Sequence, residues 1–191
     1  MRSEIEENKP IQRLTGQKAR EALSPEDRER YSRIVSKKLI AHPAVRGAAV
    51  IFSYMAFGAE LDLDLFHAEA VKQGKVLAFP VTDPAGSMEA YRPCCPDDWV
   101  RGPFGICTPR IEASVHTPPE TIDVVIVPCV AFDDSRMRIG WGGGYYDRYL
   151  VRCSKARIIG VAFEAQRLQH VAAEPGRDFR LDEVITEADF R

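Results

Sequence analysis

A glycine-rich stretch in the last third of the chain, RIGWGGGYYDRYL at 138–150, has the residue types of a loop that binds phosphate. Glycines have no Cβ, so their backbone N–H groups can approach a ligand closely and their φ angles can be positive. When such a loop opens a helix, these N–H groups and the helix N-terminus can face an anion. The candidate backbone donors are Gly140, Gly142, Gly143 and Gly144.

Charged and aromatic side chains surround these glycines. Arg138 before the loop and Arg148 in the expected helix could add fixed positive charge beside a phosphate. Asp147 is the nearby carboxylate placed to hold Mg²⁺ against phosphate oxygens. Aromatic rings beside such a loop favour stacking on a flat ligand ring, although a tyrosine here could equally belong to the core. These rings are Trp141, Tyr145 and Tyr146.

The spacing of the glycines excludes the two common phosphate-binding motifs. Gly142, Gly143 and Gly144 are consecutive, and no Lys-Ser or Lys-Thr pair follows them. Neither the P-loop nor the dinucleotide-binding fingerprint therefore fits. A purely structural turn remains an alternative to an anion-binding loop. The chain also has no nucleophile motif of the G-x-S-x-G type.

Other candidate residues lie outside the loop. Lys9 and Arg13 are four residues apart and share one face of a helix, where they could bind phosphates or simply face solvent. Glu60 follows the first expected strand, so its carboxylate could accept N–H donors of a heterocycle or merely begin the next helix. Asp182 could be a second metal ligand, but an ordinary acid at the start of a strand is the simpler interpretation. The four histidines share no metal-ligand spacing.

The composition is typical of a cytoplasmic globular protein. The 191 residues suit one domain with a substantial core, and a formal net charge of −2 gives no field that would attract nucleic acid or an anionic membrane. No signal sequence is apparent, and no apolar run approaches the ~20 residues of a membrane span. Five cysteines without a C-x-x-C pair indicate reduced thiols rather than a zinc site.

The candidate residues must be positioned by alternating helices and strands. Two helices are expected first, one from Pro10 to about Leu23 and one capped by Ser24. A third is expected over 63–74, ending at Gly74, and a short one follows the glycine loop. Apolar runs predict strands over 48–54, 75–81, 122–132, 157–163 and 182–187, with one short strand at 88–92 in an otherwise loop-like segment, 82–120.

This order predicts an α/β fold, in which a mainly parallel sheet carries helices on both faces. We expect a single three-layer domain over 1–191, with N-terminal helices. Ligands of such sheets bind outside the carboxyl ends of the strands. The glycine loop follows the carboxyl end of the strand expected at 122–132, which favours a binding role for the loop.

The stretch IDVVIVPCVAFDDSRMRIGWGGGYYDRYL at 122–150 resembles the signature of the 5-formyltetrahydrofolate cyclo-ligase family, also called methenyltetrahydrofolate synthetases. That signature runs from an apolar strand through Phe-Asp to Arg-Leu-Gly-x-Gly-x-Gly-Tyr-Tyr-Asp. The resemblance extends over nearly the whole chain. Further similar segments are KPIQR (9–13), YMAFGAELD (54–62), GKVLAFPV (74–81), FGICTP (104–109), IIGVAFEAQ (158–166) and LDEVITE (181–187).

The resemblance implies an enzyme that converts 5-formyltetrahydrofolate and MgATP to 5,10-methenyltetrahydrofolate, ADP and phosphate. In the family's mechanism the formyl oxygen attacks the γ-phosphate and forms an iminophosphate. N10 of the folate then attacks the activated carbon, and phosphate leaves as the ring closes. Such phosphoryl transfer depends on positioning and charge neutralisation, so cations, a metal and loop amides suffice without a protein nucleophile.

The resemblance also implies a nucleotide site. Lys9 and Arg13 would contact the phosphates of ATP. The loop from Gly140 to Tyr146 would surround the nucleotide and the reacting formyl group, with Arg138 and Tyr145 as catalytic residues. The implied ATP-binding set is Lys9, Arg13, Arg138, Gly140, Gly142, Gly143, Gly144, Tyr145 and Tyr146.

For folate, the resemblance implies that Glu60 accepts hydrogen bonds from the pterin. The other implied substrate-binding residues are Met55, Trp141, Gly142, Gly143, Gly144 and Tyr145. Asp147 and Asp182 would hold Mg²⁺. We therefore expect small-molecule substrates, no nucleic acid or membrane partner, and a monomer.

Three residues depart from the family pattern. Cys129 stands where Gly usually follows the proline of the strand, and Trp141 stands where Tyr or Arg is more frequent. Arg136 stands where the family normally has Gly; if that turn needs a positive φ, a non-glycine residue costs ~1–2 kcal/mol. None of these departures removes an expected phosphate or metal ligand.

Two other functions remain as alternatives to an active cyclo-ligase. A non-catalytic relative could bind folate or nucleotide and regulate a partner, which the changes at Cys129 and Arg136 would explain. A sugar-phosphate isomerase on a similar sheet would have an anion loop but little use for paired carboxylates that bind Mg²⁺.

Overall fold

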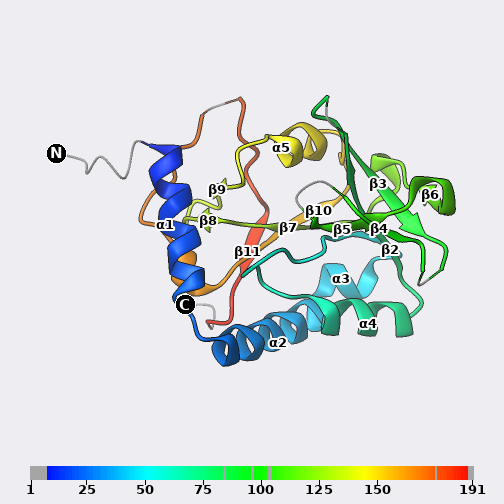
Figure 1. The fold of residues 1–191 in the computed structure, drawn as a ribbon, viewed down its shortest axis with the longest axis horizontal. Coiled ribbons are helices and arrows are strands. Elements are labelled where there is room, and N and C mark those ends of the chain that lie inside the picture. Colours follow the sequence, from blue (N-terminus) through cyan, green and yellow to red (C-terminus); the bar gives the residue numbers. More distant parts are fainter. Residues whose placement is uncertain (1–7, 84, 96, 103–104, 175, 189–191) are drawn as a thin grey trace.

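Figure 1 presents a computed structural model, which describes residues 8–83, 85–95, 97–102, 105–174 and 176–188. Its main sheet has five parallel strands in the spatial order β11 (Glu183–Ile185), β10 (Arg157–Val161), β7 (Val124–Pro128), β1 (Val50–Phe52) and β2 (Val76–Thr82). Beyond β2, the antiparallel strands β3 (Met88–Pro93) and β6 (Ser114–His116) complete the sheet. The predicted, mainly parallel sheet is confirmed.

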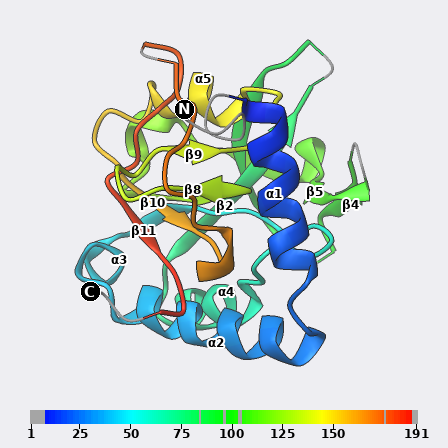
Figure 2. The same cartoon turned by 90° about the vertical axis from the view of Figure 1, so that its left-hand side faces the viewer.

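Helices cover both faces of this sheet, as expected (Figure 1). On one face lie α2 (Pro25–Ala41), α3 (Pro43–Gly47) and α4 (Asp64–Lys72), and on the other lies α5 (Tyr145–Leu150). Helix α1 (Lys9–Glu21) lies across the end of the sheet, as Figure 2 shows. None of the helices in the described ranges has both the length and the apolar character needed to cross a membrane.

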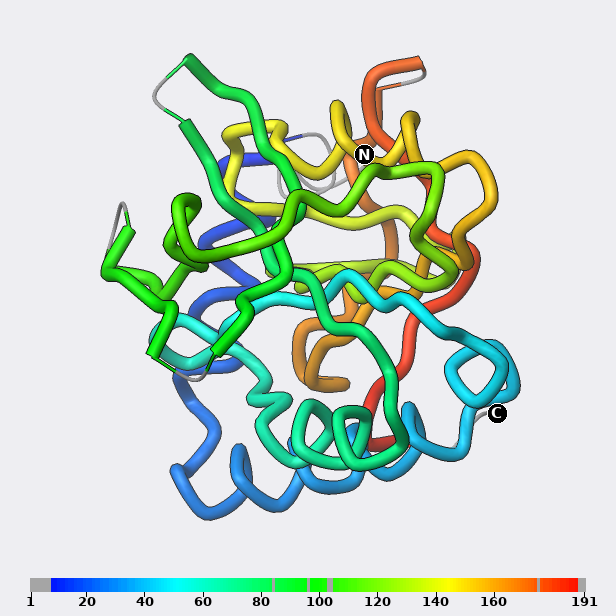
Figure 3. Tube along the Cα trace, turned by 90° about the vertical axis from the view of Figure 1, so that its right-hand side faces the viewer, coloured from blue at the N-terminus to red at the C-terminus, as the bar shows by residue number. Residues whose placement is uncertain are grey.

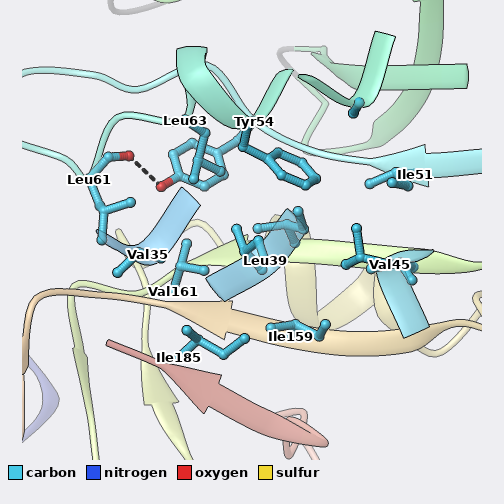
Figure 4. Packing of buried hydrophobic residues seen from close by; sticks show 14 of the residues in the cluster. Val35, Leu39, Val45, Ile51, Tyr54, Leu61, Leu63, Ile159, Val161 and Ile185 are labelled. Carbon is cyan, nitrogen blue, oxygen red and sulfur yellow. Dashed lines mark hydrogen bonds between the residues drawn. The ribbon is translucent and has the colours of Figure 1, made fainter. Parts of the chain in front are cut away.

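Alternation along the strands divides the core in two. Ile51 and Phe52 are neighbours in β1, yet Ile51 packs in the cluster toward α2 and α4 while Phe52 packs in the cluster beneath α5. Figure 4 shows the first cluster, where Val35 and Leu39 of α2 meet side chains from the strands. The hydroxyl of Tyr54 donates to the carbonyl of Leu61 at 2.6 Å, which fixes the loop after β1.

Several short elements differ from the prediction. The run at 122–132 was expected as one strand, but β7 ends at Pro128, and β8 (Ala131–Phe132) turns away to pair with β9 (Arg138–Ile139). Helix α3 and the hairpin of β4 (Trp99–Arg101) with β5 (Cys107–Pro109) were not expected. Strands of two or three residues are too short to show the alternation of apolar and polar side chains by which a strand is recognised.

The described 3₁₀ turns are η3 (Ile111–Ala113), η4 (Pro119–Thr121) and η5 (Glu164–Gln166). Phe104, part of the FGICTP segment that resembles the family, lies outside the described residues.

The expected helix boundaries are largely confirmed. The side chain of Ser24 accepts a hydrogen bond from the Asp27 amide at 3.0 Å, so Ser24 caps α2 as its sequence context predicts. Gly74 follows α4 with a φ of 76°, the left-handed conformation expected just after a helix. Asn8 caps α1 in the same way, through a bond from the Ile11 amide.

Gly16 allows α1 to pack directly on the backbone near β8. A Cβ at this position would lie 2.0 Å from the carbonyl oxygen of Val130 and 3.0 Å from the Cβ of Ala131. Because neither neighbour is a flexible side-chain end, we expect Gly16→Ala to lower the free energy of unfolding by ~1–3 kcal/mol. Urea denaturation of both proteins measures this difference.

Gly47, the last residue of α3, provides the control. A Cβ there meets nothing within 4 Å, so Gly47→Ala should change the unfolding free energy by less than about 0.5 kcal/mol. An equal loss in the two variants would show that contact with Val130 is not the cause.

Because His67 of α4 is largely buried, we expect stability to depend on pH. Its Nε2 lies 2.8 Å from the Ser53 Oγ, and burial lowers the pKa of His67 from 6.5 to about 4. Between these values the unfolded chain binds a proton that the folded chain does not, so the free energy of unfolding should fall by up to about 3 kcal/mol as the pH drops through this window. The urea-denaturation midpoint of wild type should be lower at pH 5 than at pH 7, and His67→Gln should reduce this difference. His170→Gln, which alters a half-exposed ring, should leave the slope unchanged.

Candidate functional site

The glycine loop lies between β9 and α5, at the carboxyl edge of the parallel sheet. Gly142 and Gly144 have φ values of 100° and 65°, so the path of the loop requires glycine at both positions. Gly144 directly precedes Tyr145, the first residue of α5. The structure thus confirms the expected order of strand, loop and helix.

Arg138 is a buried cation at the start of this loop. Its side chain is 3% exposed; one nitrogen donates to Asp147 Oδ1 at 3.0 Å, and the guanidinium lies over the Tyr146 ring at 5.6 Å. Within the described part of the chain, its Nε has no hydrogen-bond partner. A buried guanidinium with a free donor is costly unless a ligand completes its hydrogen bonds. Arg138 is therefore suited to bind an anion.

Helix α1 presents a stripe of cations to the loop. Lys9, Arg13 and Arg20 are spaced by four and seven residues and so share one face of the helix. Arg13 Nε donates to the carbonyl of Gly140 at 2.8 Å, and its guanidinium lies so close to Gly142 that a Cβ there would be 3.1 Å away. Of the predicted phosphate pair, Arg13 thus contacts the glycine loop, and Lys9 lies one turn earlier on the same face of α1.

Lys9 is held by two acids from the segment after η5. Its Nζ is 2.8 Å from Glu174 and 2.6 Å from Asp178. Burial tends to lower the Lys9 pKa, but the hydrogen bonds and charges of the two acids outweigh it, and the pKa is raised. Lys9 therefore carries its charge, and a phosphate would have to compete with these carboxylates for it.

Glu60 is the buried carboxylate on the other side of the loop. Its side chain is 6% exposed; Oε1 accepts from the Trp141 indole at 2.8 Å and Oε2 from the Phe57 amide at 3.0 Å. Arg20 approaches Oε1 to 3.7 Å. Burial raises the Glu60 pKa, although the Trp141 hydrogen bond and the Arg20 charge partly oppose the shift. Its two oxygens thus accept N–H donors side by side, as a planar heterocycle would supply them.

Trp141 connects the glycine loop to this carboxylate. Its ring is 49% exposed, meets Phe57 edge-on at 6.1 Å and lies beneath the Arg20 guanidinium at 5.0 Å. Met55, from the same loop as Phe57, is half-buried against the larger core cluster. An aromatic bicyclic ring is thus already seated between a cation and a carboxylate in this structure.

The opposite end of the loop contacts the β2–β3 hairpin. Arg148 donates to the carbonyl of Gly86 at 2.7 Å, and the Tyr145 hydroxyl donates to that of Asp83 at 3.5 Å. Figure 3 shows this hairpin, in green, beside the yellow segment that carries the loop. Tyr146 instead packs against Phe52 at 6.3 Å, and burial raises its pKa, so this tyrosine is partly a core residue.

The two acids predicted as metal ligands have different surroundings. Asp147 Oδ1 accepts from Arg138 and from the Phe179 amide at 3.1 Å. Asp182 lies at the amino ends of β10 and β11, where its Oδ2 accepts from the Ile158 amide at 2.7 Å. The structure therefore does not join them in one cluster. Across the described ranges, no group of three or more His, Cys, Asp or Glu residues could hold a metal.

The unusual residues before the loop have structural explanations. Arg136 has a φ of 69°, the positive value that its glycine-like position requires. Its guanidinium donates to the Asp182 carbonyl at 2.9 Å, which directs it into the 181–182 segment. Cys129 is buried, and a Cβ on Gly160 would lie 3.0 Å from its Sγ, so the bare Gly160 accommodates the thiol.

Sequence reasoning missed Arg20, which proves to be a neighbour of Glu60. The available signal was its spacing of seven residues from Arg13, which places it on the face of α1 that Lys9 and Arg13 occupy. The contact of Trp141 with Glu60 joins residues 81 positions apart in the chain, and no local pattern indicates it.

Comparisons with known proteins agree with this architecture. A model of the 5-formyltetrahydrofolate cyclo-ligase family matches residues 5–187. The 5-formyltetrahydrofolate cyclo-ligase of Escherichia coli (strain K12) is 29% identical over 171 residues, covering 87% of this chain and 93% of that protein. The cyclo-ligase of Mus musculus is 26% identical over 183 residues, covering 87% of each.

Two solved structures of 5,10-methenyltetrahydrofolate synthetases share the fold. The 5,10-methenyltetrahydrofolate synthetase of Aquifex aeolicus superposes with a TM-score of 0.82 at 31% identity, over 95% of this chain and 90% of that one. The synthetase of Mycoplasma pneumoniae has a TM-score of 0.78 at 22% identity, over 95% and 99%, and supports the fold alone. With the family match over nearly the full length, these findings show that the chain belongs to the 5-formyltetrahydrofolate cyclo-ligase family of enzymes.

Proposed function

We propose that this protein uses MgATP to convert 5-formyltetrahydrofolate to 5,10-methenyltetrahydrofolate. The observation that carries the proposal is that one short loop contacts both halves of the required site. Arg13 of the cationic stripe binds the loop at Gly140, and Trp141 of the same loop binds the buried carboxylate of Glu60. A phosphate donor at the cations and a heterocycle at the carboxylate would therefore meet at residues 140–144.

The nucleotide phosphates would lie among Lys9, Arg13 and Arg138. Arg138 has a buried guanidinium with an unused Nε donor within the described residues, and a phosphate oxygen would complete its hydrogen bonds. Lys9 would exchange Glu174 and Asp178 for phosphate. The amides of Gly142, Gly143 and Gly144 and the rings of Tyr145 and Tyr146 would enclose the transferred group.

Folate would bind where the Trp141 indole now meets Glu60. The pterin carries adjacent N–H donors on a flat bicyclic ring, which match the two oxygens of a buried carboxylate. Phe57 borders this position from the loop after β1, and Met55 of the same loop would add an apolar contact. The formyl group at N5 would then face the glycine loop.

Mg²⁺ fits this site through one carboxylate and the substrate. Protein sites for Mg²⁺ often use one or two carboxylates together with substrate phosphates. In the described structure, the two hydrogen bonds to the Asp147 carboxylate are both accepted by its Oδ1. Its Oδ2 could therefore coordinate a metal ion beside Arg138. Asp182 was predicted as the second ligand, and its bond to the Ile158 amide gives that assignment no support. When bound, Mg²⁺ would neutralise phosphate charge.

The reaction then needs positioning rather than a protein nucleophile. The formyl oxygen attacks the γ-phosphorus of ATP, its bond to phosphorus forms, and ADP leaves. Arg138 and the loop amides stabilise the charge on the transferred oxygens. N10 next attacks the formyl carbon and gives up its proton to solvent, and the carbon–oxygen bond breaks. Phosphate leaves with the former formyl oxygen, and the methenyl ring is closed.

The direct test mixes the purified protein with 5-formyltetrahydrofolate and MgATP and follows the absorbance of the methenyl product. We expect product formation that requires both ATP and Mg²⁺. Folate binding without product would instead support a non-catalytic relative, and failure to bind either substrate would overturn the proposal. We also propose a cytoplasmic monomer; the five cysteines, all of them free thiols in this structure, favour a reducing compartment.

A further inference from the structure

Arg20 is a buried cation to which the reaction described above gives no part. Its side chain is 3% exposed and lies at the C-terminal end of α1. One guanidinium nitrogen is 3.7 Å from Glu60 Oε1, and the guanidinium carbon lies 5.0 Å from the centre of the Trp141 ring. Like that of Arg138, its Nε has no hydrogen-bond partner within the described ranges.

The charges around Glu60 identify Arg20 as its counter-ion. Titratable groups close to Glu60 include Tyr54 from the loop after β1, Tyr146 from α5 and Cys129 after β7, all neutral when protonated. The cleft that Glu60 lines also carries charged side chains from α2 and from the segment leading into α4, namely Arg28, Glu29, Arg33, Asp62 and Asp64. Across the part of the chain that the structure describes, Arg20 is the cation within ion-pair distance of this carboxylate. Burying an ionised carboxylate without a counter-ion is strongly unfavourable.

We propose that Arg20 is a positioning residue of the folate site, which keeps the Glu60 carboxylate ionised and aimed at the position that the Trp141 indole now occupies. The part that concerns folate rests on the function proposed above. A ring N–H of the substrate would replace the indole N–H on Oε1, while the Arg20 contact would persist. The ion pair, at 3.7 Å, leaves Oε1 free to accept the ligand's shorter hydrogen bond.

The pairing can be tested without any ligand. Labelling with ¹⁵N-tryptophan gives one indole resonance for each of the two tryptophans, and Trp141→Phe assigns them. The Trp141 resonance should move with pH as Glu60 loses its charge. In Arg20→Gln the midpoint should rise by about 1 pH unit, because an opposite charge within 4–6 Å favours the ionised carboxylate. Arg20→Lys, which keeps the charge, should restore most of the shift.

The resonance of Trp99 serves as the control for folding. Trp99 of β4 packs against Phe79 of β2 at 4.9 Å, and its position in the spectrum should be the same in every variant. An unchanged Trp141 midpoint in a folded Arg20→Gln protein would overturn the proposal, whatever the protein binds. If Arg20→Gln does not fold, Arg20→Lys is compared with wild type, because lysine keeps the charge on a shorter side chain. A Trp141 midpoint close to the wild-type value then supports the role, and a midpoint raised by about 1 pH unit in a folded Arg20→Lys protein overturns it.

A double-mutant cycle tests the link to folate. At pH 7, Arg20→Gln should weaken 5-formyltetrahydrofolate binding about tenfold in the wild-type background and have little further effect beside Glu60→Gln. An equal loss in both backgrounds would contradict action through Glu60. Wild-type protein that binds no folate would overturn the proposed function but leave the Arg20–Glu60 pairing, measured by the indole resonance, intact.

Discussion

Replacing Arg138 by Met should lower the turnover of 5-formyltetrahydrofolate by ~10³-fold, the typical loss for a cation that stabilises a transferred phosphoryl group. The side chain is 3% exposed and paired with Asp147, so its charge is held in place beside the glycine loop. Folate affinity should change little, because Glu60 and Trp141 contact each other and not Arg138. Steady-state rates and folate dissociation constants separate the two effects.

The controls for this prediction guard against loss of folding. Removing one partner of a buried ion pair can destabilise a protein by ~3–5 kcal/mol, so the unfolding free energy of Arg138→Met must be measured with its rate. Arg138→Lys keeps the charge and should retain more activity. Arg46→Met changes an exposed arginine of α3 and should be fully active. A folded Arg138→Met enzyme with normal turnover would remove Arg138 from the catalytic residues.

Glu60→Gln should weaken folate binding by ~1–3 kcal/mol, about fivefold to more than a hundredfold, because an amide cannot accept the pterin donors at both positions. ATP affinity should be unchanged, since the cations of the nucleotide site lie on the other side of the loop. Calorimetric titration with each substrate measures the two constants. Glu69→Gln, on the outer side of α4, is the matched control and should bind both normally.

The pH dependence gives this prediction a second observable. Burial raises the Glu60 pKa, so the ionised carboxylate that binds folate should be lost at a higher pH than an exposed glutamate would allow. Wild-type affinity should therefore fall as the pH is lowered, and the affinity of Glu60→Gln should not follow it. Parallel pH profiles in the two proteins would contradict the assignment of Glu60.

Local patterns predicted the elements of the site better than its contacts. The helix cap at Ser24, the buried strands and the glycine loop follow from short-range chemistry and were predicted correctly. The turn of β8 away from the sheet was not, because Val130 and Ala131 are as apolar as β7 itself. In a buried run, hydrophobicity does not show where the chain changes direction.

Contacts between distant segments were the least predictable part. Whether Glu60 binds a ligand or begins a helix was undecided from spacing, and its burial among Arg20, Phe57 and Trp141 depends on how α1 crosses the sheet. For Asp182, the packing favours a structural role over the predicted metal-ligand role. Its carboxylate, at the start of a strand, accepts a hydrogen bond from the amide of Ile158 in the neighbouring strand. Such choices are made by tertiary packing.

The path of the formyl oxygen tests the central claim most directly. With 5-formyltetrahydrofolate labelled by ¹⁸O in its formyl group, attack on the γ-phosphate transfers that oxygen to phosphorus before the ring closes. Mass spectrometry of the inorganic phosphate from a single turnover should therefore find one ¹⁸O atom in each phosphate formed with the methenyl product. Phosphate without the label, released while the product forms, would contradict phosphorylation of the formyl oxygen and the site built around it.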